Sequence, residues 1–191
     1  MTRVLGIDPS LTGTGVAALD TSYLDNGGPL YRIQTIKSAG HKGDSLRARN
    51  DRLRRIVDRV TQLALNADLV LIEAPAFSRN TGSMWDRAGL WWSIVDTLLL
   101  DHHDVAMAPP NVVKKFAANK GNAGKDLVAV GMARLWGEEC QCANDNEWDA
   151  LTLATMAGQR LGIPGVPTRA HHAAALGGVA WDTERVPELA S

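Results

Sequence analysis

The apolar residues of this chain include two short unbroken runs that each end on an acid. Residues 4–7 are followed by Asp8, and residues 69–72 are followed by Glu73. Short runs rich in Val, Ile and Leu are typical of strands buried on both faces of a sheet. A core strand gains nothing from a carboxylate at its end, so we expect the two acids to have a function at one edge of the sheet.

Shorter apolar stretches between turn residues predict three more strands. Glycine-rich turns flank residues 16–19 and 30–37, and together with the first strand these segments predict an antiparallel meander. Residues 105–108 form another apolar stretch, which ends at Pro109 and Pro110. The sequence therefore predicts five strands.

Helical periodicity is found in the longer segments between and after these strands. They are residues 45–66, 84–100, a short stretch near 112, a segment that ends near 136, and 144–161. In the first helix, the apolar residues Leu46, Leu53, Val57, Val60 and Ala64 recur at heptad-like spacing and predict a buried face. Its other face is rich in arginine, which fits a solvated surface at least as well as a phosphate-binding one.

Residues 84–100 are apolar around nearly the whole circumference of the predicted helix. Trp85, Trp91 and Trp92 fall in this segment among several aliphatic residues. The pattern predicts either a helix buried wholly within the chain or one that a second subunit covers in part. The acids and histidines of residues 101–104 follow directly, and because four consecutive side chains point in different directions, we expect a helix end there rather than a metal site.

Length, charge and cysteine content narrow the class of protein. A chain of 191 residues with 45% hydrophobic and 21% charged residues predicts one globular domain, residues 1–165, followed by a tail, residues 166–191, that either packs on the domain or extends from it. The net charge of -1 excludes a uniformly basic nucleic-acid coat but allows local basic patches. The two cysteines, Cys140 and Cys142, are one residue apart, and neither a signal peptide nor an apolar run of membrane length is recognised. We therefore expect a cytoplasmic protein with reduced thiols and no membrane partner.

A third acid, Asp149, lies one turn inside the helix predicted at residues 144–161. Alone it is explained by the helix dipole, and Asn144 with Glu147 three residues later resembles a capping box. Considered with Asp8 and Glu73 it predicts another role, because carboxylates gathered in one place repel each other unless a cation is present. The three acids therefore predict a site for divalent metal.

The segment from residue 111 to residue 128 is basic and punctuated by glycine. Lys114, Lys120 and Lys125 precede Asp126, the first acid in this segment. Lysines beside a carboxylate cluster suit the binding and neutralisation of a phosphate. We therefore expect this segment to bind a phosphate-bearing substrate.

The loop after the second strand carries two further candidates for substrate contact, Phe77 and Arg79. Loops beside a functional site commonly bind the substrate, and an aromatic ring can stack on a base. A phenylalanine in a loop is more often packed in the core, so packing is the alternative for Phe77.

The order of these features resembles the RuvC family of Holliday junction resolvases. The matching segments are Gly6-Ile7-Asp8-Pro9-Ser10, Ile72-Glu73-Ala74-Pro75, Val113-Lys114 with Gly121-Asn122-Ala123-Gly124-Lys125, and Asp149-Ala150-Leu151. The resemblance spans about residues 3–161 and implies an α/β chain with a ribonuclease-H-like fold, in which helices flank a mixed five-stranded sheet of an antiparallel meander and parallel strands. The short length, the tail and the form of the last motif are similar to phage-encoded members.

The resemblance also implies an activity, a cofactor and partners. It implies a homodimer that nicks opposed strands of four-way DNA junctions to leave 5′-phosphate and 3′-hydroxyl ends, and the apolar pattern of residues 84–100 predicts that this helix forms the dimer interface. Two Mg²⁺ ions about 3.5–4 Å apart, for which Mn²⁺ substitutes, would share Asp8, with Glu73 on one ion and Asp149 on the other. Lys125, with Lys114, would steady the scissile phosphate, and no nucleotide cofactor is implied.

One position departs from the family's pattern. The family usually has Asp or His three residues before its final Asp, where this chain has Asn146. An amide oxygen binds a hard cation without adding charge. The sequence leaves open whether Asn146, Asp145 on nearly the same helix face, or Glu147 completes the metal site.

Three other functions fit part of the sequence. A less selective nuclease of forks and flaps would use the same metal centre, and a non-catalytic junction-binding protein fits the lost charge at Asn146. A sugar-kinase or actin-like nucleotide binder also opens with Gly-Ile-Asp and a glycine turn on a related fold. A chain of this length cannot supply the second lobe that closes over a nucleotide, which counts against that function.

Overall fold

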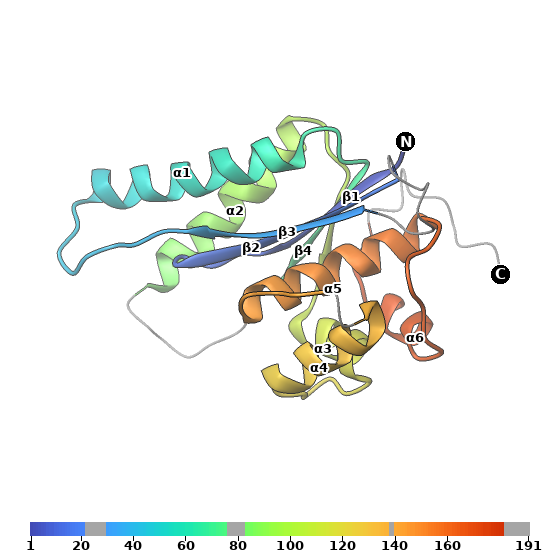
Figure 1. The fold of residues 1–191 in the computed structure, drawn as a ribbon. Coiled ribbons are helices and arrows are strands. Elements are labelled where there is room, and N and C mark those ends of the chain that lie inside the picture. The colour runs from blue at the N-terminus through green and yellow to red at the C-terminus, as the bar shows by residue number, and fades with distance from the viewer. Residues whose placement is uncertain (22–29, 76–82, 138–139, 182–191) are drawn as a thin grey trace.

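The computed structural model describes residues 1–21, 30–75, 83–137 and 140–181, which form a five-stranded sheet covered by helices on both faces (Figure 1). The strands are β1 (Arg3–Asp8), β2 (Gly13–Asp20), β3 (Leu30–Lys37), β4 (Leu69–Glu73) and β5 (Val105–Ala108). All five strands predicted from the sequence are confirmed.

The strands lie in the order β3-β2-β1-β4-β5. β1 pairs antiparallel with β2, and β2 antiparallel with β3, whereas β1 pairs parallel with β4 and β4 with β5. The predicted mixture of an antiparallel meander and parallel strands is thus confirmed. Because of these directions, the C-terminal ends of β1, β3, β4 and β5 and the start of β2 share one edge of the sheet.

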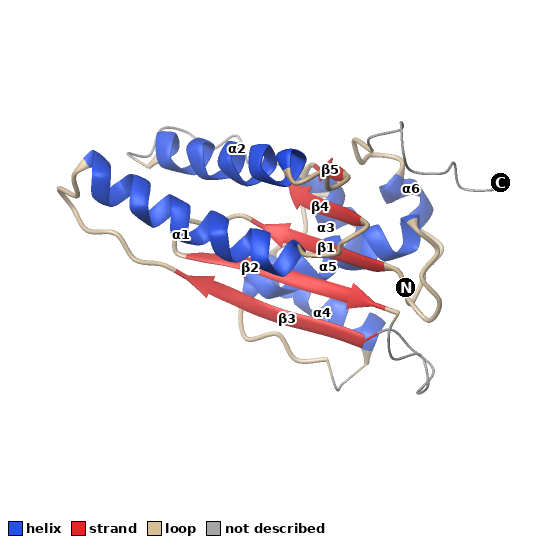
Figure 2. Cartoon of the chain, turned by 90° about the horizontal axis from the view of Figure 1, so that it is seen from above, coloured by secondary structure: helices blue, strands red, loops and turns tan. Residues whose placement is uncertain are grey.

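The helices form a layer on each face of the sheet. They are α1 (Leu46–Ala64), α2 (Met84–Leu100), α3 (Pro110–Ala118), α4 (Lys125–Trp136), α5 (Asp145–Arg160) and α6 (His172–Leu176). α1 and α2 cover one face, and α5, backed by α3, α4 and α6, covers the other (Figures 1 and 2). No helix within the described ranges is long and apolar enough to cross a membrane.

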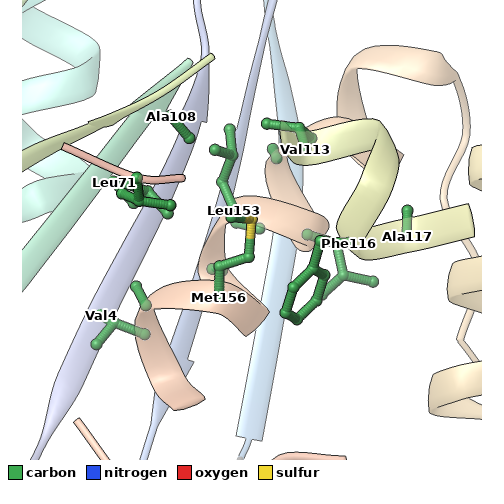
Figure 3. Packing of buried hydrophobic residues seen from close by; sticks show 14 of the residues in the cluster. Val4, Leu71, Ala108, Val113, Phe116, Ala117, Leu153 and Met156 are labelled. Carbon is green, nitrogen blue, oxygen red and sulfur yellow. The ribbon is translucent and has the colours of Figure 1, made fainter. Parts of the chain in front are cut away.

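Each face of the sheet has its own apolar core. The core under α5 includes Leu71, Phe116 and Met156, whose side chains Figure 3 shows packed together with their neighbours. The core under α1 and α2 contains Ile56 and Leu98, both almost fully buried. α5 lies so close to β1 that a Cβ atom on Gly6 would be 2.2 Å from the carbonyl oxygen of Ala150. This close approach determines where the start of α5 sits relative to the end of β1.

The prediction that Leu46 belongs to the buried face of α1 is wrong. Leu46 is 79% exposed, because it lies in the first turn of the helix, before the part that packs on the sheet. Contact with the core begins at Leu53, and Ile56, which the heptad-like pattern left out, is buried in it. The predicted N-terminus is accurate, since Ser45 accepts a hydrogen bond from the backbone nitrogen of Ala48 at 3.2 Å.

The predicted boundary at residue 165 does not mark an end of packing. Val166, Leu176 and Val179 are buried in the core under α5. Met107 of β5 and Ala180 exchange two backbone hydrogen bonds of 2.9 and 3.1 Å. Of the two arrangements that the sequence left open for the tail, residues 166–181 adopt the packed one.

Candidate metal centre

Three carboxylates meet at the sheet edge where β1 and β4 end. Asp8 ends β1 and Glu73 ends the adjacent parallel strand β4, while Asp149 lies near the start of α5, which crosses β1. Each of the three offers one oxygen, and these oxygens all lie within 4.8 Å of one another. Among the described His, Cys, Asp and Glu side chains, this is the only such group of three or more. The structure thus brings together the three acids singled out in the sequence.

The burial of these acids opposes their ionisation. Burial, and next the charge of Asp149, raises the pKa of Asp8 to about 7. Burial and the charges of Asp8 and Asp149 raise the pKa of Glu73 to about 9, and burial raises the pKa of Asp149 to about 6. Three ionised carboxylates at this spacing repel one another, and a divalent cation held between them removes that repulsion. The donor set, all carboxylate oxygen, is the one that Mg²⁺ and Mn²⁺ prefer.

Two lysines place positive charge beside the three acids. Lys125 favours ionised Asp8 and Asp149, and Lys114 favours ionised Glu73 and Asp149, so both act against the rise in pKa. Lys125 is mostly exposed, and its Nζ atom lies 3.0 Å from a carboxylate oxygen of Asp145. Both lysines are therefore positioned to meet a phosphate that approaches the carboxylates.

The three candidates for an additional metal ligand have other partners. The amide nitrogen of Asn146 donates a hydrogen bond to the backbone carbonyl of Gly13, at the start of β2. Asp145 pairs with Lys125. The carboxylate of Glu147 is buried, and each of its oxygens accepts a hydrogen bond of 2.6 Å, one from the Thr35 hydroxyl and one from the backbone nitrogen of Ala143.

Asn144 and Glu147 form only half of the predicted capping box. The Asn144 side chain accepts a hydrogen bond of 3.2 Å from the backbone nitrogen of Glu147, as the motif predicts. The Glu147 carboxylate, however, binds the nitrogen of Ala143 instead of that of Asn144, because it also reaches across to Thr35 on β3. This network fixes the first turn of α5, and with it Asp149, to the sheet.

Of the three remaining predicted DNA contacts, only Lys120 lies within the described residues. Lys120 is exposed in the turn between α3 and α4. Phe77 and Arg79 lie outside the described residues. Trp91, which the sequence marks only as an apolar residue of α2, also contacts the site: its indole nitrogen donates a hydrogen bond of 2.8 Å to the backbone oxygen of Glu73 and so holds α2 against the end of β4. The one signal for it was the need of a partly buried indole N–H for an acceptor.

We expect the metal-free protein to lose stability as the pH rises from 6 to 9. The folded pKa values of Asp8 and Glu73 lie above those of the unfolded chain, so the folded state holds protons that the unfolded state releases. Differential scanning calorimetry in EDTA should show Tm falling by about 5 °C or more over this range. Saturating Mg²⁺ should restore most of the loss at pH 9.

Glu73→Gln is the matched control, because it removes the group with the highest pKa of the three while keeping the shape of the side chain. Burial lowers the pKa of His172 to about 4, so this residue makes stability rise with pH below about pH 6.5. The effect is the same in the wild-type and Glu73→Gln proteins and cancels when the two are compared. If Tm fell equally with pH in the wild-type and Glu73→Gln proteins, the raised pKa of Glu73 would be contradicted.

The fold and the site together define a class of protein. A mixed five-stranded sheet with carboxylates gathered at the ends of β1 and β4 and at the start of the crossing helix is the arrangement of ribonuclease-H-like nucleases.

Comparison with known proteins defines the family more closely, although no protein-family model matches the sequence. A curated "Crossover junction endodeoxyribonuclease RuvC" of Clavibacter michiganensis subsp. michiganensis is 31% identical over 173 residues, which cover 87% of this chain and 83% of the relative. The chain belongs to the RuvC family of crossover junction endodeoxyribonucleases. Similarity to phage-encoded members within that family stays a prediction.

Two solved structures share the fold at low sequence identity. The RuvC structure of Thermus thermophilus matches with a TM-score of 0.65 at 21% identity, covering 87% of this chain and all of that one. T. thermophilus RuvC in complex with a Holliday junction substrate matches with a TM-score of 0.64 at 19% identity, covering 88% of this chain and all of that one. These likenesses confirm the fold class that the sequence predicted.

Proposed function

We propose that this chain is a metal-dependent endonuclease that resolves four-way DNA junctions by paired, symmetric nicks. The observation that carries the proposal is the meeting of Asp8, Glu73 and Asp149 at one sheet edge, in a chain of the RuvC family. The likeness to a RuvC bound to a Holliday junction supports branched DNA as the substrate.

Asp8, Glu73 and Asp149 would hold Mg²⁺, two ions per site, with Mn²⁺ as a substitute. When bound, the ions would lower the pKa of the attacking water and stabilise the charge on the leaving 3′-oxygen, so that cleavage leaves 5′-phosphate and 3′-hydroxyl ends. Asp8 lies on β1, which pairs with the strand that carries Glu73 and is crossed by the helix that carries Asp149, so Asp8 would help to hold both ions. All three carboxylates are at least partly buried, so they would hold the ions with reduced competition from solvent.

Lys114 and Lys125 bind the phosphate that is cut and its neighbours. Their charges already act on the three acids, which places them close enough to act on a phosphate bound there. Asp145 orients Lys125 through their ion pair, and Asn146 anchors the start of α5 on β2. We therefore assign Asp145 and Asn146 to positioning rather than to metal binding, and the loss of charge at Asn146 leaves the carboxylate site complete.

Two opposed nicks require two active sites, and the surface of α2 supports a homodimer. Trp85, Trp92 and Leu99 recur every seven residues on this helix, so they share one face, and they are 77, 65 and 50% exposed. The described part of the chain leaves these side chains exposed, which favours the second of the two arrangements left open by the sequence, partial cover by another subunit. A heptad-spaced apolar stripe fits a second copy of the same helix.

Trp92→Glu is expected to convert the dimer to a folded monomer, because it places a charge at the centre of the apolar stripe. Sedimentation velocity should show dimer affinity weakened at least about 100-fold, as for a central interface aromatic, and circular dichroism should be unchanged. Leu46→Glu, on an equally exposed apolar residue of α1, is the control and should leave the dimer intact. A dimer of wild-type affinity in the Trp92 variant would place the interface elsewhere.

Cleavage of synthetic substrates labelled on each strand in turn tests the function. The proposal predicts nicks at symmetric positions on opposed strands of a four-way junction, in Mg²⁺ and not in EDTA, with little cutting of a fork, a flap or a linear duplex. Comparable cutting of forks and flaps would instead establish a general branch nuclease. Tight junction binding without cutting in Mg²⁺ or Mn²⁺ would establish a non-catalytic junction-binding protein.

A further inference from the structure

A shallow, open groove of about 570 Å³ lies on the β3 side of the three acids. It is lined by Thr12, Gly13, Thr35, Lys37, Ser38, Ala39, Asn144 and Asn146, which come from the start of β2, the end of β3 and the start of α5. β3 is the edge strand on this side, and β5, which leads into the basic segment with Lys114, is the edge strand on the other (Figure 2).

The sheet register places this groove close to the metal centre. Asp8 on β1 pairs with Gly15 on β2, and Gly15 pairs with Thr35 on β3, so the three residues form one row across the sheet. Strands are about 4.8 Å apart, so Thr35 is about 10 Å from Asp8 along that row. The start of α5 lies over Gly15 in this row, so a DNA strand with a rise of about 3.4 Å per nucleotide needs at least about three nucleotides to pass around it from one site to the other.

One wall of the groove is held rigidly by hydrogen bonds. The Thr35 hydroxyl donates to Glu147 at 2.6 Å and accepts from the amide nitrogen of Asn144 at 2.8 Å. The side-chain amide of Asn146 is fixed on the carbonyl of Gly13. The wall is thus formed before a ligand binds, which lowers the entropic cost of binding.

The groove offers hydrogen-bond donors and positive charge but no carboxylate. Lys37 is exposed and forms no ion pair with a described residue. The Ser38 hydroxyl accepts a hydrogen bond of 2.7 Å from Arg52, so its own proton is available to a ligand. Thr12 adds an exposed hydroxyl, and Arg55 lines the hollow on the other side of residues 37–39. The hydroxyls and the lysine of this lining suit an anion, and the lining offers no carboxylate to a metal ion.

We infer that this groove binds the sugar-phosphate backbone of one DNA strand that continues from the metal centre, with Lys37 on a phosphate and Thr12 and Ser38 donating to backbone oxygens. Neutral hydroxyls with a lysine are the usual phosphate contacts in protein–DNA complexes. The inference rests on the proposed function, and it extends DNA contact to the side of the carboxylates away from Lys114. The strand is then held on both sides of the phosphate that is cut.

The test compares Lys37→Ala with Arg32→Ala, each made in a chain that also carries Asp8→Asn so that the DNA stays uncut. Arg32 is an exposed cation in the other half of β3, so its loss changes the net charge equally. Binding of a labelled four-way junction in Mg²⁺ is measured at several salt concentrations. Lys37→Ala should weaken binding about 5-fold and reduce the slope of log affinity against log salt by about one, as for one lost phosphate contact.

Arg32→Ala should leave both quantities unchanged, and Lys37→Arg should restore most of the affinity. Equal affinity and salt slope in the Lys37→Ala and Arg32→Ala proteins overturn the inference. A wild-type chain that cuts no junction, while Lys37→Ala still weakens its DNA binding selectively, contradicts only the proposed function. A chain that resolves junctions and is indifferent to Lys37→Ala contradicts only the groove.

A crosslinking measurement tests the position of the strand. Lys37→Cys should exchange with a mixed disulfide tethered to a DNA phosphate about three nucleotides from the nick, releasing the small thiol, and not with one tethered ten nucleotides away. The unaltered chain, with its buried Cys140 and half-buried Cys142, gives the background. Crosslinking that does not depend on the tether position overturns the inference.

Discussion

Replacing Asp8 with Asn should lower the rate of junction cleavage by at least about 1,000-fold. The substitution keeps the size of the side chain and removes the charge that both metal ions would share. It also relieves the repulsion that raises the pKa of Glu73, so the fold should not suffer. Single-turnover cleavage of a labelled four-way junction in Mg²⁺ measures the effect.

Junction binding separates loss of chemistry from loss of the protein. The Asp8→Asn chain should bind the junction within about threefold of the wild-type affinity, since phosphate contacts dominate DNA affinity. Asp58→Asn, an exposed acid on α1, is the matched control and should cleave normally. If a folded Asp8→Asn protein lost binding and cleavage together, or cleaved at the wild-type rate, the metal role of Asp8 would be wrong.

Gly6→Ala should destabilise the fold by at least about 3 kcal/mol, an effect at the upper end of those for overpacked cores. The new Cβ atom would lie 2.2 Å from the carbonyl oxygen of Ala150 and 2.3 Å from the backbone nitrogen of Ala154. Both are backbone atoms of α5, so the helix must move as a whole, and Asp149 moves with it. Urea denaturation measures the loss of stability, and Mn²⁺ affinity should fall in whatever protein remains folded.

Gly89→Ala is the matched control, because it adds the same methyl group in α2 with only the end of Leu53 near it, at 3.7 Å. Alanine favours a helix over glycine, so this variant should gain about 0.5–1 kcal/mol. If Gly6→Ala were as stable as the wild-type protein, α5 would not be fixed on β1 at this point.

A local pattern in the sequence marks two of the three acids that the structure brings together. Asp8 and Glu73 stand where buried strands end, and parallel neighbouring strands bring such ends together. Asp149 has no such mark, since an acid in the first turns of a helix is ordinary, and only the order of motifs along the chain connected it with the other two.

Contacts between distant residues explain what the sequence left open. Glu147 looks like a local cap, but its carboxylate binds Thr35, 112 positions away, which no helical pattern encodes. The bond from Trp91 to the backbone of Glu73 is of the same kind. The packing of residues 166–181 depends on pairing with β5 at Met107, and a single bridge leaves no periodic pattern in the sequence.

The exposure of residues also depends on position in the fold rather than on the pattern alone. Leu46 continues the apolar spacing of α1, but the helix begins before the sheet that its apolar face covers. Trp85 and Trp92 could equally have been core residues, and only the structure shows that the rest of the described chain leaves them uncovered.

Mn²⁺ binding, followed by the loss of the free-ion electron paramagnetic resonance signal, tests most directly the claim that Asp8, Glu73 and Asp149 form the metal centre. The wild-type and Asp145→Asn proteins should bind Mn²⁺ saturably with affinities within about threefold of each other, and the Asp8→Asn protein should bind it at least about 10-fold more weakly. Wild-type Mn²⁺ affinity in the Asp8→Asn protein would contradict the claim.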